Sequence, residues 1–467
     1  MSNERSFGNT FRLMRPENRL GALALILVVL TAEMAFVASI NLESALAFVG
    51  YLGVTAVVYR LLMGELHMEA IGLYAFYAFL TLVIYEVQLA EAPMYLGFSG
   101  KEGAFGTDDT YFFSLLAERV PYDMDLRLYY PEYDHTYTTF LDFISFYDVY
   151  HLMDIIWANL IPVVLLPVLT RALAYSLTDN ENVARGAFFL MAICPFTLSN
   201  SLILIRDGWS AMLFVGAVYF FYELKLGRMA ILAALLFYLR VASGLQLVMV
   251  LGIVSLVFYF RAERRWLRRS ILGGLVLAGA AVAYGSFYLL TTITPIQTFG
   301  GVFDLLFREE FLSFFRKNAP DSFLLQLYGL PTYIRLPASF AFFLVMPILP
   351  VEELFWEDVF VIRGLMFCLY SVIFLFVFRY LVAGVYDSLV SDRGRSPMIL
   401  VVISFLVLIL ALSQVSMQVR HKVMAMPLQY IIAAYGFYEG GNTGRLLGGV
   451  AMFFLVFATI LKFTAGI

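Results

Sequence analysis

Residues 202–209 read Leu-Ile-Leu-Ile-Arg-Asp-Gly-Trp, so two charged side chains, Arg206 and Asp207, lie between two apolar runs. The upstream run extends back to Phe188, and the downstream run continues to Phe221. Apolar runs of this kind are typical of helices in a lipid bilayer. A charged side chain at the centre of such a helix costs about 2.5–3.5 kcal/mol, so it is tolerated where it meets water, a partner or a charged ligand. Arg206 and Asp207 are therefore the first candidate site residues.

The composition of the whole chain is that of a helical membrane protein. Of 467 residues, 61% are hydrophobic and 14% are charged, whereas soluble domains have about 25% charged residues. The net charge of −4 offers no basic surface for a nucleic acid, and none is expected as a partner. We expect an all-α, polytopic integral membrane protein that forms one domain over residues 1–467. It should have about 13 transmembrane helices, some of them re-entrant or broken.

Positive charges place the N-terminus in the cytoplasm. Four arginines within residues 1–19 precede the first apolar run, 20–40, and such flanking charge stays on the cytoplasmic side. Counting spans from this end puts residues 91–152 outside, as a large structured loop. This loop has eleven Asp and Glu against three Lys and Arg, which fits the outer side. A second outer loop is expected at 292–336, and Arg206 falls on the same outer side.

Two later arginines occupy comparable positions. The apolar stretch that ends at Arg240 is too short for a full span, so it predicts a broken helix that lines a polar cavity. The stretch 337–350 is short and rich in proline, which favours a re-entrant segment. Arg420 and His421 then lie on the outer face, whereas they lie inside if 337–350 crosses the membrane. The re-entrant path would gather these cations with Arg206 into a pocket for a lipid-linked phosphate.

Two adjacent carboxylates in the first outer loop, Asp108 and Asp109, are candidates for a general base. Carboxylates side by side repel, which can raise one pKa enough for proton transfer. The alternatives are a metal site and the cap of a loop helix. His421 is a second candidate base, because an unperturbed histidine titrates near pH ~6.5. For the arginine at 206, the ordinary alternatives are an ion pair with Asp207 and a side chain that snorkels to the interface.

Motifs for nucleotide, thiol or zinc chemistry are absent from the sequence. It has no Walker loop, no Gly-x-Gly-x-x-Gly, no Gly-x-Ser-x-Gly and no Cys-x-x-Cys, and its four histidines lack the spacing of zinc ligands. We therefore expect no cofactor and no metal. A reaction driven by an already activated lipid phosphate needs neither.

The order of these motifs resembles that of bacterial polysaccharide-repeat polymerases, the Wzy- and EpsG-type membrane glycosyltransferases of O-antigen and exopolysaccharide biosynthesis. The residues that carry the resemblance are Gly-Thr-Asp-x-x-Tyr at 106–111, Leu-Ile-Arg-Asp at 204–207, Arg240 before a Ser-Gly, and Arg420 before Pro427. These motifs are short and are spread over about residues 100–435.

The resemblance implies a GT-C-like enzyme of the bacterial inner membrane, with its active site on the periplasmic face. Its donor and acceptor would be glycans linked to undecaprenyl diphosphate, and a chain-length regulator is a further partner that the resemblance suggests. The implied site has three diphosphate-binding arginines, three candidate catalytic residues and two residues on the sugar side: Arg206, Arg240 and Arg420; Asp108, Asp109 and His421; Tyr111 and Asp207. Many relatives have glutamine or another polar residue at the position of Asp207, which leaves the partner of Arg206 open.

Two other functions remain alternatives. O-antigen ligases share the architecture that the resemblance implies. A transporter or flippase of lipid-linked sugars would also need arginines inside the membrane. Against a transporter, the sequence has no visible duplication of halves, and the acidic loop at 91–152 has no counterpart on the inner side.

Overall fold

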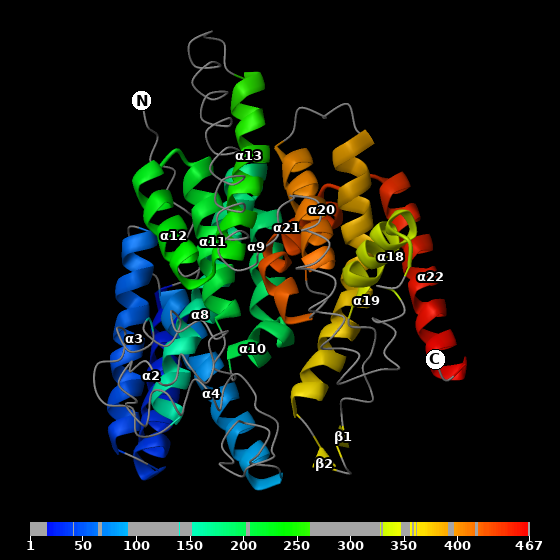
Figure 1. Cartoon of the computed structure of the whole chain (residues 1–467). Coiled ribbons are helices and arrows are strands. Elements are labelled where there is room, and N and C mark those ends of the chain that lie inside the picture. The colour runs from blue at the N-terminus through cyan, green and yellow to red at the C-terminus, as the bar shows by residue number, and fades with distance from the viewer. Residues whose placement is uncertain are drawn as a thin grey trace, which may run out of the picture. The chain divides into compact units, whose positions relative to one another are not determined.

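The structure is a computed structural model, and its chain is helical (Figure 1). The structure describes residues 16–40, 42–63, 68–91, 140, 152–201, 206–261, 327, 330–346, 355–356, 359–360, 362–390, 397–415 and 419–465.

Helices make up nearly all of the described part of the chain, with one hairpin of two short strands. The first group of helices is α2 Pro16–Ile40, α3 Leu42–Met63, α4 Met68–Glu91, α8 Leu152–Thr178, α9 Glu181–Ala192, α10 Pro195–Ser201, α11 Asp207–Tyr222, α12 Leu226–Leu239 and α13 Val241–Arg261. The remaining elements are α18 Thr332–Val345, β1 Phe355–Trp356, β2 Val359–Phe360, α19 Ile362–Val390, α20 Met398–Val415, the 3₁₀ helix η4 Val419–Met424, α21 Met426–Tyr438 and α22 Asn442–Ala465.

Several of these helices are suited to a bilayer. Within the described ranges, four helical stretches are long and apolar enough to cross a membrane: Ser44–Met63, Ile156–Thr178, Gly364–Val390 and Asn442–Ile460. Large apolar side chains on α22, such as Leu446, Phe453 and Phe454, are more than 60% exposed, as lipid-facing side chains would be. The expectation of a helical membrane protein is confirmed at this level, and the number of spans stays a prediction.

The chain divides into two compact units, which are described separately. Unit 1 comprises Met1–Ala172, Ala187–Met212 and Pro350–Tyr370, and unit 2 comprises Leu173–Gly186, Leu213–Leu349 and Ser371–Ile467. Helices α8, α11 and α19 each begin in unit 1 and end in unit 2.

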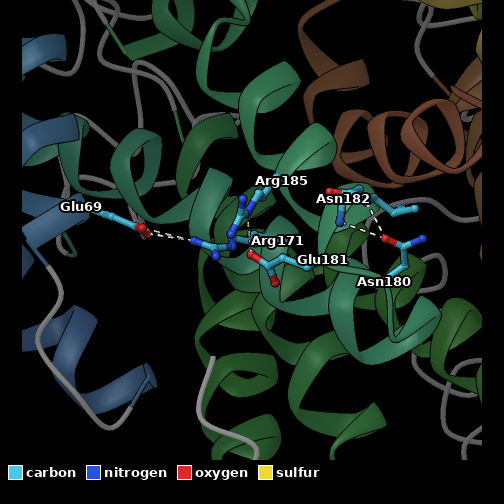
Figure 2. A network of polar contacts seen from close by, with 7 residues as sticks. Glu69, Arg171, Asn180, Glu181, Asn182 and Arg185 are labelled. Carbon is cyan, nitrogen blue, oxygen red and sulfur yellow. Dashed lines mark hydrogen bonds and ion pairs between the residues drawn. The ribbon is translucent and has the colours of Figure 1, made fainter. Parts of the chain in front are cut away.

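In unit 1, helices α2, α3 and α4 pack against one another, as Figure 1 shows for the first two. The Phe48 ring lies between Tyr74 and Trp157, with ring centroids 5.6 and 5.1 Å away. At the start of α4, Glu69 accepts hydrogen bonds of 3.1 and 3.2 Å from Arg171 of α8 (Figure 2). This ion pair joins α4 to α8 within unit 1.

One apolar run, 186–205, contains a break that its hydropathy does not predict. In its described part the structure has α9 and α10, with a break before Pro195. Proline has no backbone N–H to donate and disfavours a helical conformation in the residue before it. Helix α9, before the break, begins at a cap in which the Asn182 N–H donates to the Asn180 side chain at 2.9 Å (Figure 2). Neither α9, with 12 residues, nor α10, with 7, is long enough to span a bilayer alone.

In unit 2, α13 and α20 pack side by side in opposite directions. Val250 and Val254 of α13 line an apolar cavity together with Leu400 and Ser404 of α20. The late part of α13 thus lies near the early part of α20. The start of α13 lies beside the end of α20, because Arg240 just before α13 contacts His421 in η4 just after α20. Helix α20 also packs against α18 and α21.

Glycines allow the backbones of α19, α21 and α22 to approach closely. A Cβ on Gly436 would lie 2.1 Å from the Tyr380 carbonyl oxygen and 2.5 Å from the Gly384 nitrogen. A Cβ on Gly448 would lie 2.0 Å from the Arg379 carbonyl oxygen. Real Cβ contacts are not this short, so only glycine fits these crossings. Small residues at such crossings are the usual means by which helices pack in membranes.

We expect Gly436→Ala to destabilise the protein by about 1–3 kcal/mol, because the added methyl group must push two helix backbones apart. The measurement is the thermal unfolding midpoint of the purified protein in one detergent. Gly53→Ala is the matched control, since a Cβ at Gly53 in α3 meets nothing within 4 Å. Equal midpoints for the two variants would contradict the close crossing.

Candidate functional site

The charged turn before α11 belongs to unit 1. Arg206 is half-buried, and its carbonyl oxygen accepts the Ser210 N–H at 2.9 Å, which opens α11. Asp207 is the first residue of α11 and is 3% exposed. A carboxylate at the first turn is stabilised by the positive end of the helix dipole. The sequence placed both residues at the start of a helix, and the structure agrees.

An aromatic side chain from the end of the predicted outer loop packs close to this turn. Phe140 meets the ring of Trp209 edge-on, with centroids 4.9 Å apart. The Trp209 indole N–H in turn donates to Asn159 of α8 at 3.2 Å. Since Trp209 follows Arg206 by three residues, the contact brings Phe140 close to the charged turn, and the side of the membrane stays a prediction.

In unit 2, Arg240 interrupts the helix as the sequence predicted. Its backbone is extended, with φ −161° and ψ 100°, and it separates α12 from α13. The two helices pack against each other as a hairpin, with Arg240 at the turn (Figure 1). Helix α12 has 14 residues, and at about 1.5 Å per residue it covers only part of a bilayer.

The side chain of Arg240 reaches a residue 181 positions later. Its Nη2 lies 2.6 Å from Nε2 of His421 in η4, which is a hydrogen bond. His421 is 8% exposed, and Arg240 is half-buried. Two of the predicted site residues are thus in direct contact. The re-entrant path for 337–350 stays a prediction.

The next residue, Lys422, is fully buried and holds η4 in place. Its Nζ donates to the carbonyl oxygens of Leu344 and Met346 at 2.7 and 2.8 Å, at the end of α18. The same ammonium group lies 4.4 Å from the centroid of the Phe374 ring in α19, a cation–π contact. Lys422 therefore satisfies carbonyl groups that the end of α18 would otherwise leave unpaired.

A buried hydroxyl lies next to Arg240 in the sequence. Ser243, in the first turn of α13, is 1% exposed, and its Oγ has no hydrogen-bond partner among the residues that the structure describes. A buried hydroxyl without a partner costs about 1–3 kcal/mol. Ser243 is thus available to a polar ligand or to water.

The elements that meet at His421 have no acidic residue. This holds for α12, α13, α18, α20, η4 and α21, whose sequences contain neither Asp nor Glu. The nearest carboxylate on α19, Asp387, is thirteen residues beyond Phe374, about 20 Å along the helix. Guanidinium, ammonium and imidazole groups therefore gather here without a carboxylate on these elements. Such a setting suits an anion.

The other predicted site residues lie outside the described residues, have no described side chain, or belong to unit 1. Asp108, Asp109 and Tyr111 lie outside the described residues, as do His67, His135 and His151. For Arg420 the structure describes the backbone in η4 and not the side chain. Arg206 and Asp207 belong to unit 1. Among the described residues, no group of three or more His, Cys, Asp or Glu could hold a metal ion.

Sequence reasoning missed the roles of Lys422 and Ser243. A lysine in a polar stretch is usually exposed, so its sequence position does not reveal that it ends a helix 76 residues away. For Ser243, the spacing of three residues after Arg240 at a helix start was an available clue.

No protein-family model, curated protein or solved structure matches this chain.

We expect Lys422→Met to lower the free energy of unfolding by about 1.5–3 kcal/mol, because the end of α18 loses its charged donor. Unfolding in a mild detergent, followed by tryptophan fluorescence, measures this change. Lys225→Met is the control, since Lys225 is exposed and its nearest carboxylate, on Glu223, is 4.0 Å away. If the two variants unfold alike, Lys422 does not hold η4 to α18.

Proposed function

We propose that this protein is a membrane glycosyltransferase that polymerises oligosaccharide repeats linked to undecaprenyl diphosphate. It works at the outer face of the bacterial inner membrane, with its N-terminus in the cytoplasm and about 13 spans. Residues 91–152 and 292–336 form its periplasmic loops. Its partners are the lipid-linked donor and acceptor and, during chain growth, a chain-length regulator.

The observation that carries this proposal is the contact of Arg240 with His421 among elements that lack carboxylates. An arginine and a histidine held in contact where helices of a membrane protein meet suit an anionic ligand. Guanidinium geometry matches phosphate oxygens in particular. A diphosphate carried on a lipid brings such oxygens to membrane depth.

In the proposed reaction, a hydroxyl oxygen of the acceptor glycan bonds to the anomeric carbon of the donor glycan. The bond from that carbon to the diphosphate oxygen breaks, and the diphosphate leaves with its charge. Arg240 stabilises that developing charge, an electrostatic contribution that is usually large.

The hydroxyl proton goes to Asp108 or Asp109 in the proposed reaction. His421 was the other candidate base, but its Nε2 is engaged by Arg240. While that hydrogen bond is present, this nitrogen is not free to accept the proton, so the carboxylates are the preferred base. Tyr111 and Asp207 serve the sugar side of the site.

We expect Arg240→Ala to reduce polymerisation by about 10²–10³-fold, the usual effect of removing one donor from a site of developing charge. The assay is a gel of surface polysaccharide from the source strain, with the gene deleted and then restored as wild type or variant. The ladder of repeats should collapse to a single repeat in the deletion and in Arg240→Ala. Protein abundance is measured in parallel by immunoblot.

Arg185→Ala is the matched control, since Arg185 pairs with Glu181 one turn away, and both side chains are at least 30% exposed (Figure 2). It should restore the full ladder, because exposed pairs of this type contribute about 0.3–0.5 kcal/mol. Loss of every repeat in the deletion strain would indicate a ligase or a flippase. An unchanged ladder would exclude the proposed activity.

We expect Asp108→Asn or Asp109→Asn to abolish the ladder, whichever residue is the base, because an amide cannot accept the proton. Asparagine caps helices as well as aspartate does, so a carboxylate that only caps a loop helix tolerates the change. The same gel measures both variants. Polymerisation in membranes with excess EDTA should persist, and loss of activity there would favour the metal alternative for this pair.

A further inference from the structure

We infer that Arg379 of α19 and Arg445 of α22 bind the phosphate group of an anionic membrane phospholipid, beside the crossing of these two helices in unit 2. The inference does not depend on the proposed polymerase activity. It concerns a different part of unit 2 from the contact between Arg240 and His421.

Helices α19 and α22 run in opposite directions where they cross. A Cβ on Gly444 would lie 2.5 Å from Oδ2 of Asp387, whereas Gly448, one turn further along α22, lies against the backbone of Arg379. A Cβ on Gly449 would lie 4.0 Å from Nε of Arg379. The Arg379 side chain therefore passes over α22 at a position that has no side chain.

Arg445 lies on the same side of α22 as this contact. It precedes Gly449 by four residues, which is about one helical turn, and residues at that spacing are neighbours on a helix surface. The two guanidinium groups therefore belong to one patch of the surface, although they come from helices that are far apart in the sequence.

Arg379 has no anionic partner within the described part of the chain. It is half-buried, and its Nε is buried and makes no hydrogen bond to any described residue. Its guanidinium carbon lies 5.8 Å from the centroid of the Tyr380 ring, a cation–π contact. A guanidinium has several N–H donors and no acceptor, so an anion can still bind to it.

Arg445 is held in place but keeps donors for a ligand. Its Nη2 donates to the carbonyl oxygen of Phe437, in the last turn of α21, at 2.9 Å. Its Nε is buried and has no hydrogen-bond partner among the described residues. Because Arg445 lies in the first turn of α22, its charge is close to the positive end of that helix dipole. A bound anion would offset both positive charges.

The carboxylates nearby in the sequence have other partners. Asp387 is the one acidic residue in the sequences of α19, α21 and α22, and its Oδ2 accepts the Gly441 N–H at 2.9 Å. Glu439, in the turn between α21 and α22, accepts a hydrogen bond from the Asn180 side chain. Neither carboxylate forms an ion pair with Arg379 or Arg445 in the part of the chain that the structure describes.

The patch is at a depth that suits a lipid headgroup. Helix α22 is apolar enough to cross a bilayer from Asn442 to Ile460, so its first turn is expected at a membrane surface. Gly448, which lies against Arg379, is six residues after Asn442, about 9 Å along the helix. The headgroup region of one leaflet is about 5–8 Å deep, so both arginines can reach its phosphate groups.

Apolar side chains continue the patch toward the membrane interior. Phe376 precedes Arg379 by three residues and is 69% exposed, and Phe453 follows Arg445 by eight residues and is 66% exposed. Because the helices are antiparallel, both rings lie further from the start of α22 than the arginine of their own helix. A phosphate over the arginines would thus have its acyl chains beside Phe376 and Phe453.

This arrangement favours an anionic lipid over a zwitterionic one. Guanidinium geometry matches phosphate oxygens, and each arginine near a membrane surface attracts anionic lipid. The ammonium group of a zwitterionic headgroup would be repelled by the same two charges. The crossing itself is closed by backbone contacts at Gly444 and Gly448, so the lipid lies over it and not within it.

The test is native mass spectrometry of the full-length protein in a mild detergent, titrated with dioleoyl phosphatidylglycerol or dioleoyl phosphatidylethanolamine. We expect Arg379→Gln with Arg445→Gln to weaken binding of phosphatidylglycerol by about 25-fold, or about fivefold for each arginine. Wild type should bind phosphatidylglycerol more tightly than phosphatidylethanolamine. Equal affinity of wild type and the double variant for phosphatidylglycerol would overturn the inference.

The control is Arg60→Gln with Lys225→Gln, which removes the same net charge from two exposed side chains near helix ends. It should bind phosphatidylglycerol as wild type does. An equal loss of affinity in this control would assign the effect to net charge and reject the site. If wild type binds both lipids equally well, the preference for an anionic lipid is wrong.

A second measurement uses wild type and covers a double variant that does not fold. The protein is placed in nanodiscs that contain phosphatidylglycerol with a photoreactive group on its headgroup, and the crosslinked peptides are identified by mass spectrometry. The crosslinks should include peptides from the second half of α19 and the first half of α22. Crosslinks confined to other helices would overturn the inference.

Discussion

A cationic side chain placed among apolar helices needs polar partners, because its charge is costly away from water. In unit 2 this constraint determines how the α12–α13 turn, η4 and the end of α18 contact one another. Arg240 joins the turn of the α12–α13 hairpin to η4 through His421, and Lys422 joins η4 to the end of α18. Adjacent residues of one short 3₁₀ helix thus connect segments that lie far apart in the sequence.

The polar groups of this protein gather where helices end. Arg206 precedes the first residue of α11, Arg240 separates α12 from α13, and His421 lies in the short helix between α20 and α21. Helix ends leave backbone N–H and carbonyl groups without partners, so they are the places where an apolar helical body can present polar groups to a ligand. The close glycine crossings of α19, α21 and α22 have the opposite character, since they bury backbone against backbone and leave no room for a ligand.

A site of this kind would recognise charge rather than a particular sugar. In an environment of low dielectric, interactions between charged groups are stronger than in water, and an anion that arrives already attached to a lipid need not be drawn from solution. In the proposed reaction, Asp108 or Asp109 in the loop 91–152 takes the proton of the acceptor hydroxyl. The proposed enzyme therefore separates binding of the leaving group, by the membrane helices, from activation of the acceptor, by the outer loop.

The sequence by itself determined the helical membrane class, most of the helix positions, the break at Arg240 and the charged start of α11. Each of these follows from the hydropathy of the local sequence, from the free-energy cost of a charged side chain in the membrane, or from nearby residues that end a helix. The break in the run 186–205 was missed because the high hydropathy of that run outweighed the effect of Pro195. Only the tertiary structure decided that Arg240 meets His421 and that Lys422 ends α18. Those contacts join residues 181 and 76–78 positions apart, and such pairings depend on how whole helices pack, which local pattern does not encode.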